Sequence, residues 1–194
     1  MIQPISNTPP NVDFLSGPLR DYTIVLQGNT TTPATQISVG GIPSRRTLFK
    51  FNIPPRIVDS TTIVRASLLL TQTPNRGVNA HDSIWVFPVA ILASPVVSDP
   101  STVLRFVSGG GFLGLDSLHL APGDSGVRAF QIVGLVRTWH NTTEEISPNA
   151  LALLSGSESE LPSQIDFFST QAPAAVRPRL RITYVPQQNI GLPK

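Results

Sequence analysis

Apolar and polar residues alternate in short runs along much of the chain, which is the pattern of β-strands that bury one face. The clearest run covers residues 62–72, in which Ile63 and the triplet Leu68, Leu69 and Leu70 mark a buried strand. Further strands are predicted at residues 22–27, 36–39, 45–51, 83–92, 127–132, 150–154, 164–169 and 179–185. The chain is therefore expected to fold mainly from strands.

The run at residues 45–51 shows the alternation most plainly, because Leu48 faces away from Phe49 and Phe51. The pair Pro54-Pro55 ends this run, since proline cannot donate a hydrogen bond to a neighbouring strand. We expect one strand here, with its phenylalanines toward a core.

Prolines and glycines punctuate the sequence without a period, with 19 of the first and 14 of the second, and they leave little room for long helices. Pro88 predicts a bulge or an edge position in its strand. Residues 93–126 are expected to be rich in loops, and residues 133–139 have a spacing that allows one or two helical turns. The pattern predicts an all-β fold, an antiparallel β-sandwich of jelly-roll type with about ten strands and at most one short helix.

Residues 18–185 are expected to form this sandwich as a single domain. A proline-containing arm at residues 1–17 precedes it, and a tail at residues 186–194 follows it. Two interpretations of these ends stay open, because such arms are either disordered or strapped onto a neighbouring subunit.

The composition of the chain excludes several classes of protein and of site. Hydrophobic residues make up 40% of the chain and charged residues 13%, which is too apolar for a disordered tail. The net charge is only +2 and no basic run is interleaved with aromatic residues, so no nucleic-acid partner is expected. The absence of cysteine rules out disulfides, thiolate metal sites and catalytic thiols.

No direct membrane insertion is expected either. The longest apolar stretch, residues 84–97, is broken by Pro88 and Pro95 and is too short to span a bilayer. The first residues carry neither the basic start nor the apolar core of a signal peptide. Either export is absent, or a leader is missing from the chain as given.

Four strand-like segments follow one another in a set order, and they include Thr47-Leu48-Phe49-Lys50-Phe51, Arg65-Ala66-Ser67-Leu68-Leu69-Leu70, Val136-Arg137-Thr138-Trp139 and Arg179-Leu180-Arg181-Ile182-Thr183-Tyr184. In this order and spacing, residues 22–185 resemble the bacterial DNRLRE-type domain, a jelly-roll module of surface and secreted proteins akin to a family of carbohydrate-binding modules. The resemblance implies a β-sandwich, an extracytoplasmic location (periplasmic, cell-surface or secreted) and a non-catalytic role. It also implies that Trp139 is a core tryptophan.

Several motifs of known enzymes occur in part, and each has a simpler explanation. Residues 123–126 read Gly-Asp-Ser-Gly, as in chymotrypsin-like proteases, but proline and glycine there predict a plain turn. Gly109, Gly111 and Gly114 have dinucleotide-fingerprint spacing without the helix that should follow. The three histidines do not share metal-ligand spacing. We expect no catalytic residue, no metal and no cofactor.

Two features remain as candidate binding residues. Arg177, Arg179 and Arg181 alternate with apolar residues, so their guanidinium groups are expected to line one face of the last strand. This face is either the solvated side of a half-buried strand or a contact for an acidic partner or anionic polymer. The glycine loop Gly109, Gly110 and Gly111 is the second candidate for contact with a partner.

The function predicted from these features is that of a non-catalytic, extracytoplasmic structural or adhesive subunit. Its expected partners are other protein subunits, including those of a membrane-associated complex reached through protein contacts. The alternative is a carbohydrate-binding module for a polysaccharide. Exposed aromatic rings would favour the alternative, but Trp85 and Tyr184 fall in predicted strands, which counts against exposed rings.

Overall fold

The structure is a computed structural model that describes residues 32–75, 81–93, 117–139, 147–156, 158 and 160–186. It confirms the all-β prediction, because the described strands form two antiparallel sheets packed as a sandwich. Sheet A contains β1 (Gln36–Gly40), β8 (Gln164–Phe168), β3 (Thr61–Thr73), β6 (Gly126–Gln131) and β9 (Arg179–Pro186). Sheet B contains β2 (Thr47–Lys50), β7 (Ser147–Ser155), β4 (Ile84–Ala93) and β5 (Leu118–Leu120).

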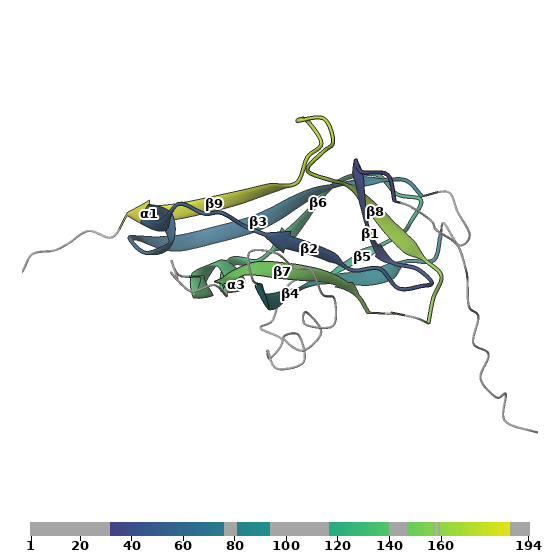
Figure 1. The fold of residues 1–194 in the computed structure, drawn as a ribbon, viewed down its shortest axis with the longest axis horizontal. Coiled ribbons are helices and arrows are strands. Elements are labelled where there is room, and N and C mark those ends of the chain that lie inside the picture. Colours follow the sequence, from purple (N-terminus) through teal and green to yellow (C-terminus); the bar gives the residue numbers. More distant parts are fainter. Residues whose placement is uncertain are drawn as a thin grey trace, which may run out of the picture.

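The two sheets lie as layers along the long axis of the molecule, with β3 and β9 in the upper layer of Figure 1 and β7 and β4 in the lower one. Their facing sides form the main core, in which Phe130 meets Phe167 edge-on at 6.3 Å between ring centroids. Trp139 is 1% exposed and stacks on Phe51 at 5.1 Å. The prediction that Trp139 packs in the core is confirmed.

Strand β3 organises sheet A because it is long enough to pair with three others. β6 lies along one edge of β3, through pairs such as Leu68 with Phe130. β9 pairs with residues from Thr61 to Leu69 of β3, and β8 joins at Gln72 and Thr73. β9 and β8 therefore continue one another in different parts of the sheet, joined by a turn that stands out from the upper layer in Figure 1.

Two short helices are present in the described residues, so the prediction of at most one is wrong. α3 (Val133–Thr138) lies where the helical turns were predicted. α1 (Pro55–Val58) follows the proline pair that ends the run of β2. Proline at the first helical position lacks only an N–H that would be unpaired anyway, so Pro54-Pro55 stops a strand and starts a helix. None of the helices described could cross a membrane.

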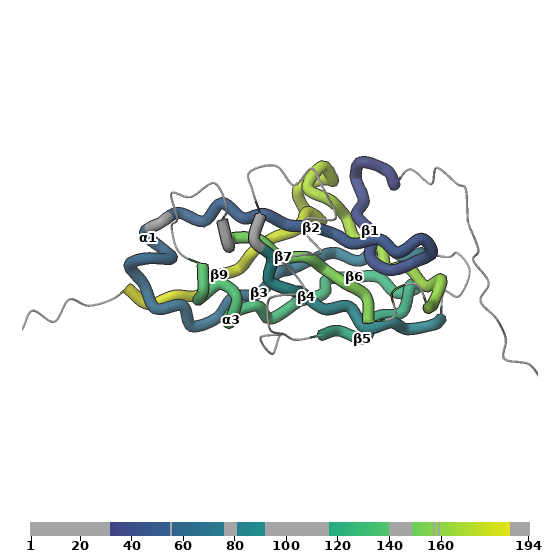
Figure 2. Tube along the Cα trace, turned by 60° about the horizontal axis from the view of Figure 1, so that its bottom comes forward, coloured from purple at the N-terminus to yellow at the C-terminus, as the bar shows by residue number. Residues whose placement is uncertain are grey.

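A tight hairpin links the two sheets, and Figure 2 shows the chain passing from β1 through it into β2 and on to α1. Gly40 and Gly41 have φ angles of +83° and +86°, a region that side chains disfavour. The Gly40 and Arg45 backbones exchange two hydrogen bonds of 2.9 Å. This pairing places Arg45 before β2, which starts at Thr47 and is shorter than the predicted strand 45–51.

Sheet B buries apolar residues on both faces. Leu151 and Leu153 of β7 belong to the main core, whereas Ala150, Ala152 and Leu154 belong to a second cluster on the opposite face. Residues from β4 complete this second cluster, namely Phe87, Val89 and Ile91. The strand β7 is therefore buried on both sides.

Pro88 lies within β4 and pairs with Leu153 of β7. β4 is an inner strand of sheet B, but β5 pairs only with Ile84, Trp85 and Val86. At Pro88, the other side of β4 has no partner among the described strands, so the predicted edge position holds locally. The register shift of β4 lies further on, between Ile91 and Ala93, so the alternative of a bulge at Pro88 is wrong.

Several predicted segments lie outside the described residues. They are the strand at residues 22–27, the glycine loop Gly109–Gly111, the arm at residues 1–17 and the tail from residue 187 onward.

Candidate functional site

The outer face of sheet A carries three exposed arginines on neighbouring strands. Arg179 and Arg181 lie on β9, where Leu180 and Ile182 alternate with them and pack toward the core. Arg65 lies on β3 and is opposite Thr183 of β9. Since Arg181 is two residues from Thr183, Arg65 and Arg181 are diagonal neighbours. The Cα atoms of such neighbours are about 7–8 Å apart. We call these three residues the arginine face.

Arg177 does not belong to the arginine face. It lies in the turn before β9, and its Nε donates to the carbonyl of Ala172 in the same turn. Pro178 separates it from the first residue of the strand. The predicted alignment of three arginines on one strand therefore applies to Arg179 and Arg181, and Arg65 takes the third place.

Alternation alone could not place Arg65 beside β9, because the pairing of β3 with β9 joins residues far apart in the sequence. The register with β9 shifts between Ile63 and Arg65, which leaves Val64 unpaired in a bulge. Ile63 and Ala66 are buried, whereas Val64 and Arg65 between them are exposed. The sequence held a partial signal, because Arg65 and Ser67 alternate with the apolar residues that follow them, which places Arg65 on the outer face but not beside β9.

No described acidic residue forms an ion pair with the arginine face. The ion pairs between described residues join Arg46 to Glu158 and Arg128 to Asp124. Asp166 shares the outer face of sheet A but lies toward β1, opposite Thr73 and Ser38. The arginine face is therefore a region of uncompensated positive charge within the described surface.

The carboxylate of Asp166 is held by neutral donors and is 9% exposed. Ser38 Oγ and Gln164 Nε2 each donate to Oδ1 at 2.6 Å, and Asn75 Nδ2 donates to Oδ2 at 2.9 Å. These bonds satisfy both carboxylate oxygens, as a buried charge requires. Asp166 thus links β1, β8 and the end of β3. Its carboxylate is hydrogen-bonded to these neighbours and not to the arginine face.

Exposed apolar side chains border the arginine face. Val64 is 45% exposed and Val185 is 55% exposed, and they lie at the end of sheet A where β3 begins and β9 ends. Tyr184 is 43% exposed, but it pairs with the buried Ile63 and therefore lies on the other face of β9. Among the described strands β9 pairs with β3 alone, so its second edge has no strand partner there. An open edge and large apolar side chains therefore occur together on β9.

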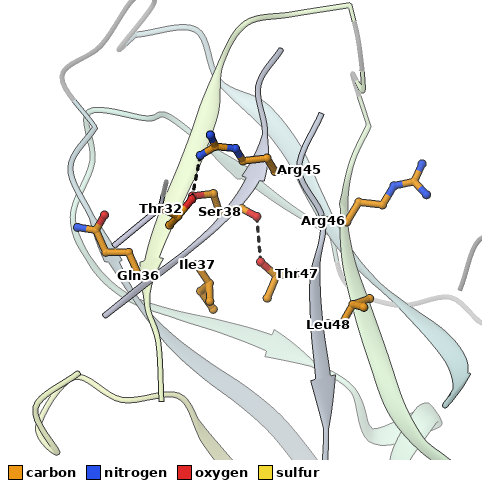
Figure 3. Close-up of a pocket in the computed structure, with 8 residues that line it drawn as sticks. All are labelled: Thr32, Gln36, Ile37, Ser38, Arg45, Arg46, Thr47 and Leu48. Carbon is orange, nitrogen blue, oxygen red and sulfur yellow. Dashed lines mark hydrogen bonds between the residues drawn. The ribbon is translucent and has the colours of Figure 1, made fainter. Parts of the chain in front are cut away.

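A groove with a volume of about 460 Å³ lies on the side of the sandwich where β1 and β2 meet. Figure 3 shows Arg45 directed toward Thr32, with Arg46 and Leu48 on the β2 side, away from Gln36. The residues lining the groove are mostly polar, and they are Thr32, Gln36, Ile37, Ser38, Arg45, Arg46, Thr47 and Leu48. The groove could hold a small neutral polar molecule, but no aromatic ring is among its lining residues.

Both arginines of the groove donate hydrogen bonds to neighbouring side chains. Arg45 Nη1 donates to the hydroxyl of Thr32 at 3.0 Å. Arg46 Nε donates to both carboxylate oxygens of Glu158, at 2.8 and 3.0 Å, and Nη2 makes a further contact. This hydrogen bonding with Glu158 raises the pKa of Arg46 above its ordinary value. Glu158 therefore offsets the charge of Arg46, whereas the Thr32 hydroxyl leaves the charge of Arg45 in place.

A half-exposed aromatic pair lies on sheet B. The ring of Trp85 in β4 is 4.8 Å from that of His119 in β5, between centroids, and Trp85 is 51% exposed. The expectation that a strand position keeps Trp85 from exposure is wrong, because Ile84 and Val86 take the buried positions on either side. That alternation was visible in the sequence. The groove and Trp85 do not converge, since β7 separates β2 from β4.

The partial enzyme motifs have structural explanations where they are described. Pro122 and Gly123 form a turn, as predicted, and Asp124 pairs with Arg128 at 3.3 Å. Among the residues that the structure describes, no group of three His, Asp or Glu residues is placed to hold a metal ion. Gly109, Gly110 and Gly111 lie outside these residues, so their predicted role stays a prediction.

Comparison of the chain with models of known protein families finds no match, and neither does comparison with curated proteins. The resemblance to DNRLRE-type domains is supported by the structure at the level of a β-sandwich of two antiparallel sheets.

Proposed function

We propose that this chain is a non-catalytic structural or adhesive subunit that binds other proteins in a larger assembly. The observation that carries the proposal is the combination on β9 of an edge with no described partner and the exposed side chains of Tyr184 and Val185. Unpaired backbone groups at a sheet edge are a template for a strand from another chain, and soluble proteins normally protect such edges.

The finer resemblance supports this role. Segments from Thr47 to Phe51 and from Arg179 to Tyr184 have the order typical of DNRLRE-type modules of surface and secreted proteins. We propose an extracytoplasmic location on the same basis. Cell fractionation with a tag at the C-terminus tests it, and recovery in the cytosol would contradict this location.

The assembly role is tested on the tagged chain recovered from its native source under mild conditions. Sedimentation velocity should show a particle larger than the monomer. The variant Tyr184→Lys/Val185→Lys should shift most of the protein to the monomer position, because charges on an edge strand block pairing with a further strand.

The matched control is Leu48→Lys/Leu161→Lys, which adds the same charge at two other exposed apolar residues, 37% and 36% exposed. It should leave the particle intact. A wild-type chain that sediments as a monomer would refute the assembly role, and equal dissociation of both variants would refute the place assigned to β9.

A carbohydrate-binding module is the second candidate, and the half-exposed ring of Trp85 favours it. Sugar rings stack on exposed aromatic faces, and Trp85 offers one beside His119. If this function holds, the isolated monomer should be retarded in gels that contain a polysaccharide. Trp85→Ala should abolish the retardation, whereas Tyr184→Ala, at an exposed ring on the other sheet, should preserve it. A monomer that migrates alike with and without every polysaccharide tested would contradict this candidate.

A further inference from the structure

We propose that the arginine face is a docking surface for an acidic segment of a protein partner. This inference rests on the proposed assembly role and adds the chemistry of the partner. The arginine face combines Arg65 of β3 with Arg179 and Arg181 of β9. The pairing of these strands brings the three residues together, which the sequence alone does not show.

The charge of the face determines what can bind there. All three side chains are exposed, and the described acidic residues leave them without an ion pair. Arg65 and Arg181 are diagonal neighbours on adjacent strands, close enough for two guanidinium groups to contact one carboxylate. Arginine binds carboxylates in a bidentate manner and is enriched in protein interfaces. An acidic ligand is therefore the complement of this face.

The side chains around the arginines favour a protein over an anionic polysaccharide. Val64 and Val185 border the face on one side, and Val127 of β6, 56% exposed, lies on the same outer face. A protein partner gains by burying such apolar groups, whereas a hydrated, charged polymer does not. Sugar recognition would favour an exposed aromatic ring, and none lies between these arginines in the described strands.

Neutral polar groups fill the space between the charges. Ser67 lies opposite both Arg181 and Gln131, and its Oγ donates to Gln131 Oε1 at 2.8 Å. Thr183 is exposed opposite Arg65. An extended acidic segment laid across the strands would therefore meet guanidinium and hydroxyl groups in alternation.

Fluorescence anisotropy at low ionic strength provides the test, with three labelled probes. The first is a peptide that alternates glutamate with valine, the second alternates glutamate with serine, and the third is polygalacturonate. The wild-type chain should bind the glutamate–valine peptide more tightly than the glutamate–serine peptide. The variant Arg179→Ser/Arg181→Ser should weaken its binding at least about tenfold, since two of the three guanidinium groups are removed.

The control Lys50→Ser/Arg56→Ser removes the same charge from exposed residues of β2 and α1 and should weaken binding less than about twofold. Equal losses in the two variants, or no binding of either peptide, would overturn the proposal. Binding of polygalacturonate with the same arginine dependence, and no preference for valine, would assign the face to polysaccharide instead. A native particle that forms without Arg179 and Arg181 refutes this docking surface alone, whereas a monomeric wild type refutes the assembly role.

Discussion

At the scale of single residues, one glycine fixes how the chain passes between the sheets. Gly40 has a φ of +83°, and a Cβ there would lie 2.7 Å from the carbonyl oxygen of Ser163 and 2.9 Å from Ile84 Cδ1. Gly126 also has a positive φ, +110°, but no atom lies within 4 Å of the place that its Cβ would take. A comparison of substitutions at the two glycines therefore distinguishes the cost of the backbone conformation from the cost of close packing.

Gly40→Ala should therefore destabilise the protein more than Gly126→Ala. Both changes force an L-residue into a disfavoured conformation, at a cost of about 1–2 kcal/mol. In Gly40→Ala the new Cβ also forces Ser163 and Ile84 to move away from it, which adds about 1–3 kcal/mol to the loss of stability. Urea unfolding followed by tryptophan fluorescence measures the difference. Equal free energies of unfolding for the two variants would show that the approach of Ser163 costs nothing.

Residue-level prediction from the sequence succeeded where one local rule decides. Trp139 was placed in the core, and Leu48 was placed opposite Phe49, as the burial of these residues confirms. The prediction that Arg177 lies on the last strand is wrong, because alternation does not hold through Pro178, where the chain has not yet entered β9. The prediction for Trp85 is wrong because a strand buries only every second residue, so a strand position does not imply burial.

At the scale of elements, β7 differs from a strand with one solvated face. Its residues from Ala150 to Ser155 are all buried, and they divide between the two apolar clusters of sheet B. Such a strand reads as a continuous apolar run, which explains why periodicity alone could not assign its two faces. β6, at an edge of sheet A, has the opposite character, with Val127, Ala129 and Gln131 exposed.

A pair of identical substitutions tests this difference. Ala152→Glu places a carboxylate on the buried outer face of β7 and should lower the free energy of unfolding by more than about 3 kcal/mol, or prevent folding. Ala129→Glu on the exposed face of β6 should change it by less than about 0.5 kcal/mol. Thermal unfolding followed by circular dichroism compares them. Similar melting temperatures would contradict the burial of β7 on both faces.

The strands and helices could be predicted because proline, glycine and alternation act locally. The pairing of strands could not, because it joins residues far apart in the sequence. The sequence shows the end of the β2 run at Pro54, but it does not show that the same proline pair opens α1. The joining of β8 and β9 along one edge of β3 depends on contacts between distant residues. For this reason the sequence alone does not place Arg65 beside Arg179 and Arg181.

At the scale of the whole molecule, the sandwich presents three different surfaces. The outer face of sheet A is positively charged at the β9 end, the groove between β1 and β2 is polar and internally paired, and sheet B offers Trp85 beside His119. These features lie on separate parts of the described surface and do not converge on one small-molecule site. Contacts with large partners suit this arrangement better than a single pocket does.

Hydrogen exchange of the β9 amides tests the assembly role most directly. In an antiparallel pair, alternate residues direct their amides to the neighbouring strand, so about half of those in β9 point to β3 and the rest to the second edge. The amides at this second edge should exchange rapidly in the isolated chain and become protected in the native assembly, while those facing β3 are slow in both. Equally fast exchange of the second-edge amides in both states would contradict a partner strand on β9.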